Sequence, residues 1–235
     1  VPLGVCSSFD RAADMLIRHG MAREVSKGEM LDTLARSREL GLVLSADNVQ
    51  KNVGFICHCC ACCCNVLQGV SRFGYPNMIV TSSFIAGSDR TECQACGTCV
   101  EACPIDAIAM KPTAGEEADG PRPEVDTALC MGCGVCALRC PSDAMKLHRR
   151  EQRVIHPETT FERVLLQCLE RGTLQNHIFD DPGSLTQKVM RAVLGAFLGL
   201  PPVKRALMSD QLRSRFLSGM KAGVASQGKA QLTTV

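Results

Sequence analysis

The sequence predicts an α+β protein in which a small cysteine-rich domain is flanked by mainly helical N- and C-terminal segments. Two cysteine runs repeat each other at the same spacing, which indicates an internally duplicated domain. Apolar residues recur at helical intervals before and after these runs. The chain has 235 residues, of which 46% are hydrophobic, so it can bury a core and is neither disordered nor fibrous.

Sixteen cysteines set this composition apart. Such a count indicates either a secreted disulfide framework or metal ligation inside a reducing cell. The N-terminus lacks a basic region followed by an apolar one, so nothing in it indicates export. The longest apolar stretch, residues 192–203, is short of the roughly 20 residues that a membrane-spanning helix needs. We therefore expect a cytoplasmic protein with metal-binding cysteines and no transmembrane span.

Local composition divides the chain into four segments. We expect a helical N-terminal segment over residues 1–50 and a cysteine-dense redox or metal module over residues 51–87. The duplicated domain should cover residues 88–148, and a basic helical docking segment residues 149–235.

The N-terminal segment shows the pattern of two helices and a strand. Apolar residues between positions 9 and 17 recur at helical spacing. Ser26 and Glu29 form a capping-box pattern before the second helix, and Gly41 ends it. A short strand is expected over residues 42–44. Another is expected over Met78–Thr81.

The two matched runs each follow the pattern C-x2-C-x2-C-x3-C-P. They contain Cys93, Cys96, Cys99 and Cys103 in the first run, and Cys130, Cys133, Cys136 and Cys140 in the second. Three thiolates at intervals of three residues can bind three irons of one [4Fe-4S] cluster, while the fourth lies too far along the chain and binds the other cluster. We therefore assign one cluster to Cys93, Cys96, Cys99 and Cys140, and the second to Cys130, Cys133, Cys136 and Cys103. Zinc is the main alternative, but it usually takes two separated cysteine pairs.

The runs, which end at Pro104 and Pro141, resemble those of the bacterial two-cluster ferredoxins, with all eight ligand positions matched. The resemblance implies a pseudo-symmetric ferredoxin-like fold and one-electron chemistry at low potential. The linker over residues 111–124 is rich in proline, glycine and acid and looks longer than in the smallest ferredoxins. We expect it to form a surface loop.

A second group of cysteines occupies six of eight consecutive positions. These are Cys57, Cys59, Cys60, Cys62, Cys63 and Cys64. Thiolates so close together repel one another unless a cation draws charge away, which favours metal or cluster ligation. Neighbouring side chains of an extended chain point in opposite directions, so we expect only a subset to bind one centre. A zinc site and a thiol/disulfide relay are the alternatives, and His58 is either a ligand or a polar surface residue.

A stretch of the type CxCCxCCC just before a two-cluster domain is similar to that of a group of larger iron-sulfur proteins from anaerobes. Residues 5–103 resemble this group throughout. The resemblance implies redox chemistry in anaerobic metabolism and specifies neither a cluster type nor a reaction.

The C-terminal segment is basic and carries two apolar stripes on either side of Pro201 and Pro202. The stripes are Val189, Met190, Val193, Leu194, Phe197 and Leu198, and then Leu212, Phe216 and Met220. Such helices can dock an acidic partner, lie peripherally on an anionic membrane, or pack on the rest of the chain. A second basic cluster directly follows the second cysteine run, where it could steer a redox partner or form a solvated strand end. It consists of Lys146, His148, Arg149, Arg150 and Arg153.

These features favour an iron-sulfur electron-transfer subunit of a larger oxidoreductase complex over a stand-alone enzyme. We expect two [4Fe-4S] clusters and an additional iron-sulfur centre in the cysteine-dense segment, and we assign no catalytic residue. The sequence has no dinucleotide fingerprint and no P-loop, so a flavin would belong to a partner redox subunit. The alternatives are a reductase with a catalytic cluster or dithiol at Cys57–Cys64, and a DNA-binding iron-sulfur redox sensor. Nucleic acid is not an expected partner, because the N-terminal helices carry mixed charges instead of a basic stripe.

Overall fold

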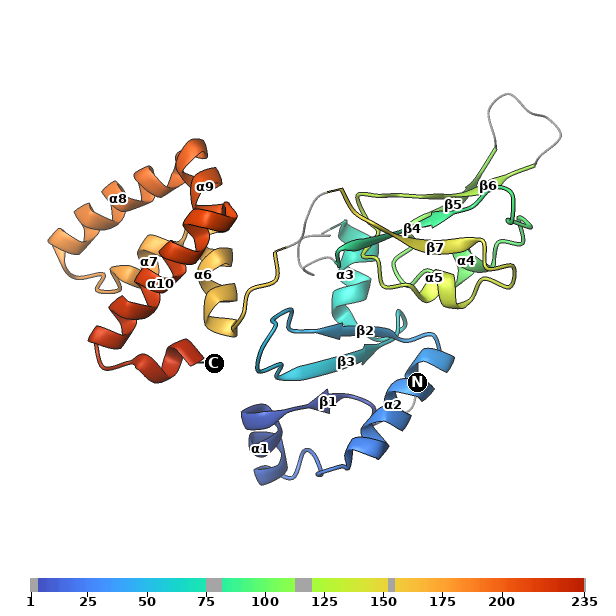
Figure 1. Cartoon of the computed structure of the whole chain (residues 1–235), viewed down its shortest axis with the longest axis horizontal. Coiled ribbons are helices and arrows are strands. Elements are labelled where there is room, and N and C mark those ends of the chain that lie inside the picture. The colour runs from blue at the N-terminus through green and yellow to red at the C-terminus, as the bar shows by residue number, and fades with distance from the viewer. Residues whose placement is uncertain (1–3, 75–81, 113–119, 152–154, 235) are drawn as a thin grey trace. The chain divides into compact units, whose positions relative to one another are not determined.

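Helices and small antiparallel sheets make up the chain as far as residue 149, and the described elements after it are helices, which confirms the mixed α and β composition (Figure 1). The computed structural model describes residues 4–74, 82–112, 120–151 and 155–234. The chain divides into two compact units. The first contains Val1–Asn48 and Val53–Ile155, and the second contains Val49–Asn52 and His156–Val235.

A three-stranded antiparallel sheet organises the N-terminal part of the first unit. Its strands lie in the order β1 (Ser7–Ser8), β3 (Phe55–Cys59) and β2 (Val43–Ala46). In β1 and β3, Ser7 lies opposite Ile56. The predicted strand after Gly41 is therefore confirmed as β2, and the cysteine-dense segment begins inside the central strand.

Two helices connect β1 to β2, as the apolar spacing predicts. They are α1 (Asp10–Arg18) and α2 (Lys27–Glu39). The Ser26 hydroxyl accepts a hydrogen bond from the Glu29 N–H at 3.2 Å, so half of the predicted capping box is formed. Gly41 takes a left-handed φ of +70° after the second helix, which ends it as expected.

His58 is buried in this sheet, with 3% of its surface exposed. Its Nδ1 lies 2.7 Å from the Ser37 hydroxyl and its Nε2 lies 3.4 Å from the Ser7 hydroxyl. Ser37 donates its own proton to the Thr33 carbonyl, so its oxygen accepts from the Nδ1–H of His58. The Ser7 hydroxyl lies within reach of both Nε2 and the Val5 carbonyl, at 3.4 and 3.3 Å. Burial also lowers the pKa of His58, which favours this neutral ring. The expectation of a surface or metal-binding histidine is wrong, because both ring nitrogens are used inside the fold.

Helix α3 (Asn65–Phe73) leads from the sheet to the part of the first unit that holds the duplicated cysteine runs (Figure 1). That part contains two short helices and two antiparallel strand pairs. The helices are α4 (Thr98–Glu101) and α5 (Val135–Leu138), and the pairs are β4 (Phe84–Ser88) with β7 (Met145–Arg149), and β5 (Ile108–Lys111) with β6 (Arg122–Val125).

The linker between the runs is only partly a loop. Arg122, Pro123 and Glu124 belong to β6, and Lys111 ends β5, so both ends of the predicted loop form a hairpin. The expectation is wrong at these ends because their backbone groups pair with each other in spite of the proline. The strand predicted over Met78–Thr81 lies outside the described residues.

One hydrophobic core joins α3 and β2 to the duplicated domain. Its members lie on elements from β2 to β7 and include three of the run cysteines. They are Val43, Leu67, Val70, Ala86, Cys99, Ile105, Ala107, Ile108, Cys130, Met131, Val135, Cys136 and Met145. The cysteine-dense segment and the duplicated domain are thus parts of one packed unit.

The second unit is helical. Its elements are α6 (Thr160–Arg171), α7 (Leu174–Ile178), α8 (Leu185–Gly199), α9 (Pro201–Met208), α10 (Asp210–Ser226) and a 3-10 turn, η2 (Ala230–Thr234). The predicted break at the proline pair is confirmed, because α8 ends at Gly199 and Pro201 begins α9. No helix among the described residues combines the length and the hydropathy that a bilayer-spanning helix needs.

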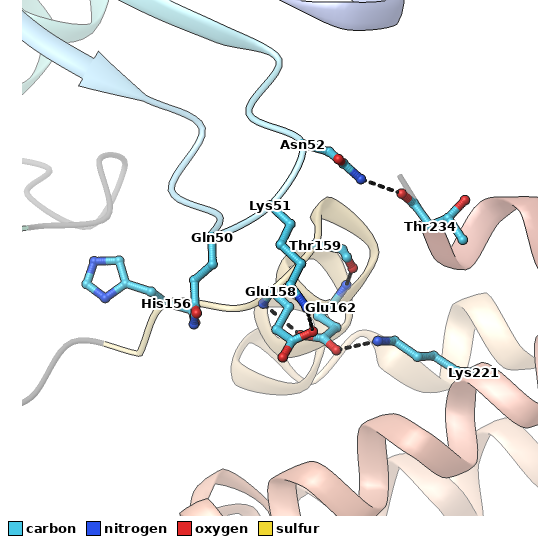
Figure 2. A network of polar contacts seen from close by, with 9 residues as sticks. All are labelled: Gln50, Lys51, Asn52, His156, Glu158, Thr159, Glu162, Lys221 and Thr234. Carbon is cyan, nitrogen blue, oxygen red and sulfur yellow. Dashed lines mark hydrogen bonds and ion pairs between the residues drawn. The ribbon is translucent and has the colours of Figure 1, made fainter.

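Polar contacts around α6 hold this unit together (Figure 2). Glu162, 7% exposed, accepts a hydrogen bond from the Glu158 N–H at 2.8 Å and pairs with Lys221 of α10 at 2.6 Å. Lys51 pairs with Glu158 at 2.8 Å, and Asn52 donates to the Thr234 carbonyl at 2.9 Å. The short segment Val49–Asn52 therefore belongs to the helical unit by its hydrogen bonds.

The predicted apolar stripe of α8 is mostly uncovered. Val189, Val193 and Phe197 are 56%, 61% and 54% exposed, whereas Leu198 is buried. On α10, Leu212 is exposed, and the buried residue is Leu217, which the predicted stripe omits. Helical spacing therefore predicts the helices, but not which apolar residues the unit covers.

Candidate metal centres

A first cavity in the duplicated domain is lined by four cysteines that come from both runs. Cys93, Cys96 and Cys99 belong to the first run, and Cys140 is the last cysteine of the second. The cavity has an empty volume of about 330 Å³, part of it open to solvent. The structure thus brings together the four residues that the spacing assigns to one cluster.

A second cavity has the complementary lining. Cys130, Cys133 and Cys136 belong to the second run, and Cys103 is the last cysteine of the first. Its empty volume is about 310 Å³. Because each run contributes its last cysteine to the other cavity, the two sites form only when both runs are folded together.

Left-handed backbone positions explain how each run wraps its cavity. Gly97 and Gly134 begin the short helices with φ of +77° and +79°. Asp106 and Asp143, each three residues after the last cysteine of its run, have φ of +55° and +58°. The two runs therefore share their local backbone conformation. Gly132 has a second constraint, because a Cβ there would overlap the carbonyl oxygen of Phe84 in β4.

Two arginines anchor the first cysteine of each run, and the sequence reasoning missed this role. Arg122 donates to the carbonyl oxygen of Cys93, and Arg150 donates to that of Cys130. Arg150 also donates through Nε to the Phe84 carbonyl at 3.1 Å. Arg150 is therefore a positioning residue of the cysteine loop, not a solvated charge for docking.

Three other residues of the predicted basic cluster are exposed. Lys146, His148 and Arg149 are exposed on β7. The Arg149 guanidinium lies 6.0 Å from the centre of the Phe84 ring. Arg153 lies outside the described residues.

Hydrogen bonds favour negative sulfur in the first cavity. The Thr98 hydroxyl, 3.3 Å from the Cys96 sulfur, lowers the pKa of this thiol. At Cys140, burial raises the pKa, but the Met145 N–H at 3.4 Å and the Ser142 hydroxyl outweigh it, so that the pKa is lowered. The Ala95 N–H donates to the Cys93 sulfur at 3.4 Å. At the buried Cys99, by contrast, burial raises the pKa of the thiol, so the cavity runs from an exposed sulfur at Cys96 to a buried one at Cys99.

The second cavity is drier. Burial raises the pKa of Cys133, and it raises the pKa of Cys136 to about 12. The Ala107 N–H donates to the Cys103 sulfur at 3.2 Å. Thiols in such a place become thiolates only when a positively charged metal centre replaces their protons.

The spacing of the sulfurs fits a cluster better than a single ion. Among the described residues, no three sulfurs of either cavity lie within 4.8 Å of one another. Four thiolates around one zinc ion, at about 2.3 Å each, would stand about 3.8 Å apart. In a cubane, each thiolate binds a different iron and the sulfurs stand farther apart. The donor set, all sulfur with N–H groups aimed at it, therefore suits a [4Fe-4S] cluster.

The cysteine-dense segment separates into two groups. The sulfurs of Cys60, Cys62 and Cys63 lie 2.7, 2.9 and 3.7 Å apart, in the pairs 60–62, 60–63 and 62–63. In the described part of the chain, this trio alone has three sulfurs within 4.8 Å. Residues 61–63 form a turn, so neighbouring cysteines converge. The premise of an extended chain is wrong here.

The trio is near the surface and asymmetric in its protonation. Hydrogen bonds from the thiols of Cys62 and Cys63 lower the pKa of Cys60 to about 7. Its hydrogen bonds with Cys60 and Cys62 raise the pKa of Cys63 to about 12. Cys62 and Cys63 are exposed, so reagents in solution can reach them.

The other three cysteines of the segment lie apart from the trio, next to a cysteine that the sequence reasoning did not consider. Burial raises the pKa of Cys57 most, and the charge interaction with the Cys6 thiol raises it further. Burial also raises the pKa of Cys59 to about 12, with further contributions from Cys64, Cys57 and Cys6. The signal for Cys6 was weak, because a single cysteine before a two-residue strand has no motif around it.

Comparison with known families identifies the duplicated domain. Residues 92–144 match the family model of the 4Fe-4S dicluster domain. This part of the chain is an iron-sulfur, ferredoxin-like domain, and the match supports metal binding and electron transfer. Comparisons with curated proteins and with solved structures gave no match.

Proposed function

We propose that this chain is an electron-transfer subunit that relays single electrons through two [4Fe-4S] clusters. Cys93, Cys96, Cys99 and Cys140 bind one cluster, and Cys130, Cys133, Cys136 and Cys103 bind the other in a pseudo-symmetric ferredoxin domain. The observation that carries the proposal is the lining of the two cavities, in which three cysteines of one run meet the last cysteine of the other.

The residues around the cavities suit a relay and not a catalytic site. Each bound cluster supplies a one-electron couple. Four cysteines per cavity occupy every iron of a cubane, so no coordination position is left for a substrate. Cys99, Cys130 and Cys136 are buried in the same hydrophobic core, so both sites border one apolar region. The first cavity opens to solvent at Cys96, where electrons can enter or leave.

The flanking helices support a place within a larger oxidoreductase complex. Helix α8 exposes Val189, Val193 and Phe197, and it carries Lys188 and Arg191. An apolar stripe beside basic side chains suits an acidic redox subunit, including one that holds a flavin. The protein would act in the cytoplasm, in anaerobic metabolism. Its chain would keep the four segments that the sequence predicts, and the cysteine-dense segment would hold an additional iron-sulfur centre.

Iron counting in variants tests the exchanged ligation. After anaerobic reconstitution, the C93A/C96A double variant should lose about four irons per chain relative to the wild type. Adding Cys140→Ala should remove no further iron, because all three cysteines belong to one cluster. Adding Cys103→Ala instead should remove iron from the second cluster as well. If Cys140→Ala removed further iron and Cys103→Ala removed none, each run would bind its own cluster. If the C93A/C96A variant lost no iron, both assignments would be rejected.

Reductive titration tests the relay itself. Titration with a one-electron viologen reductant should show one electron per cluster in the wild type, followed by the EPR signals of reduced clusters. The C93A/C96A variant should take up one electron fewer and keep the signal of the other cluster. A wild type that binds iron but takes up no electrons would contradict the relay.

A dithiol reductase is the second candidate, and the exposed trio favours it. Two electrons from the clusters and two protons would convert a disulfide of a partner protein or small molecule into two thiols, with Cys60 and Cys62 passing through a disulfide. Their sulfurs lie 2.7 Å apart, within reach of that bond. Cys62→Ser should abolish disulfide reduction with a viologen donor while the two-cluster spectrum stays intact. Unchanged turnover in this variant would remove the candidate.

A further inference from the structure

The sheet register brings Cys6 to the cysteine-dense strand. Ser7 lies opposite Ile56 and Ser8 opposite Phe55. Continuing this antiparallel register by one residue places Cys6 opposite Cys57. Directly opposite residues point to the same face of a sheet, with Cβ atoms about 4.5–5.5 Å apart.

Cys57 and Cys59 share one face of β3. The side chains of residues two apart on a strand point to the same face, and their Cα atoms lie about 6.7 Å apart. His58 points to the other face, where Ser7 contacts its ring nitrogen at 3.4 Å. That contact independently supports the register, because it places Ser7 with His58 on one face and leaves Cys6 on the face of Cys57 and Cys59.

Cys64 completes the group from the next element. It is the residue before α3, a nine-residue helix. Cys64 and Cys59 both pack against the hydrophobic core that contains Cys99, Cys130 and Cys136. Two of the four cysteines thus face the core, while Cys6 is exposed at the edge of the sheet. We call Cys6, Cys57, Cys59 and Cys64 the inner group, to distinguish it from the outer trio of Cys60, Cys62 and Cys63 at the turn.

The two groups differ in spacing. The trio has the dimensions of a site for one ion, with sulfurs within 4.8 Å. No three sulfurs among Cys6, Cys57, Cys59 and Cys64 lie that close, and the same holds for the cysteines of each ferredoxin cavity in the described residues. The inner group is therefore not a compact single-ion site of the kind that the trio forms.

We propose that Cys6, Cys57, Cys59 and Cys64 are the four ligands of a third iron-sulfur cluster, with Cys6 supplied from β1. This inference specifies the additional centre of the proposed function. Because Cys59 and Cys64 pack on the core that both cavities border, the third cluster would extend the same relay. The outer trio would remain free of this cluster.

Iron analysis of the full chain tests the ligand set. Wild-type protein reconstituted anaerobically should hold about twelve irons, and Cys6→Ala should hold about eight. The reduced-state EPR spin count should fall by about one third, with the signals of the two ferredoxin clusters unchanged. Loss of one iron with a new signal in the oxidised protein would also support Cys6 as a ligand.

Two variants provide matched controls. The C60A/C62A/C63A triple variant and Cys168→Ala, in helix α6, should both keep about twelve irons. A loss of about four irons in the triple variant but not in Cys6→Ala would overturn the ligand set and assign the cluster to the trio. A wild type with about eight irons would reject the third cluster and leave the two-cluster relay standing.

Thiol protection gives a second readout that does not depend on iron counting. Alkylation of Cys6 and Cys57 should slow at least tenfold when the apo chain is reconstituted, while that of Cys168 should not change. Equal alkylation of Cys6 with and without iron and sulfide would contradict the proposal, even if a substitution at Cys6 impaired folding.

Discussion

The Arg150 guanidinium donates a hydrogen bond to the backbone carbonyl of Cys130, and Arg122 makes the equivalent bond to Cys93. The first cysteine of each run is thereby tied to a strand pair of its own domain. Cys130 is buried, so its carbonyl would lack this charged donor if Arg150 were replaced. Through these two arginines, strand pairs that carry no cysteine help to hold the cysteine loops in position.

Arg150→Met should loosen the second cavity selectively. Losing a hydrogen bond to a charged group costs about 1.5–3 kcal/mol, which corresponds to about a tenfold or greater acceleration of iron release. Release to a chelator should become biphasic, with only the irons of the Cys130 cavity in the fast phase. Arg149→Met, which removes a neighbouring exposed arginine, should leave the kinetics unchanged. Equal rates in both variants would show that the Cys130 contact has no such role.

Gly132→Ala should prevent assembly of the second cavity. The residue has φ of +67°, and an added Cβ would overlap the Phe84 carbonyl. Gly97→Ala is the matched control, because Gly97 has φ of +77° but an added Cβ there would meet no atom of the described residues within 4 Å. The control should lose only about 1–2 kcal/mol from the left-handed backbone. Iron content after reconstitution should therefore fall by about half of the ferredoxin complement in the first variant and stay complete in the second.

Thr98→Val should lower the reduction potential of the cluster in the first cavity. The Thr98 hydroxyl lies 3.3 Å from the Cys96 sulfur, and a hydrogen bond to sulfur stabilises the more negative, reduced state. One hydrogen bond of about 1 kcal/mol corresponds to about 40 mV for a one-electron couple. A redox titration followed by EPR should show this shift in one signal only. Thr127→Val, at an exposed threonine away from the sulfurs, should shift neither.

The spacing of the runs predicts the grouping of the eight ferredoxin cysteines because ligand geometry is local and periodic. Three cysteines in one loop are close whatever the rest of the chain does, and a fourth after a short helix is not. Caps at Ser26 and Gly41 and the break at Pro201 are predictable for the same reason, since each depends on a few adjacent backbone groups.

Features that depend on contacts distant in sequence could not be predicted. Cys6 joins Cys57 only because β1 pairs with β3, and His58 is buried only because Ser37 and Ser7 reach it from other elements. Arg150 looked like a surface charge because its carbonyl partner is 20 residues away. In each case the decisive partner is fixed by tertiary packing, which a local pattern does not encode.

Lys51→Met should change the acid sensitivity of the helical unit. A hydrogen bond from Lys51, and its charge, lower the pKa of Glu158 below 4.5. A lowered carboxyl pKa contributes stability that is fully present above the unfolded value and is lost as the pH falls through the folded value. Amide exchange in α6 of the full chain should therefore differ between variant and wild type at about pH 7 and converge as the pH falls below the lowered pKa of Glu158. The difference should be small because both side chains are exposed, and a difference that grows on acidification would contradict the assignment.

Lys221→Met should destabilise the same unit much more strongly, because its partner is buried. Lys221 lies 2.6 Å from Glu162, whose side chain is 9% exposed, and this carboxylate also accepts from the Glu158 N–H at 2.8 Å. Leaving a buried charge short of a partner costs about 1–3 kcal/mol. Adding Glu162→Gln to Lys221→Met should recover most of that loss, since the amide oxygen still accepts from the Glu158 N–H and no charge is left buried. Amide exchange in α6 and α10 of the full chain would measure Lys221→Met, the double variant and Lys51→Met. If Lys221→Met and the exposed-pair variant Lys51→Met accelerated exchange equally, burial of Glu162 would not be what makes this ion pair matter.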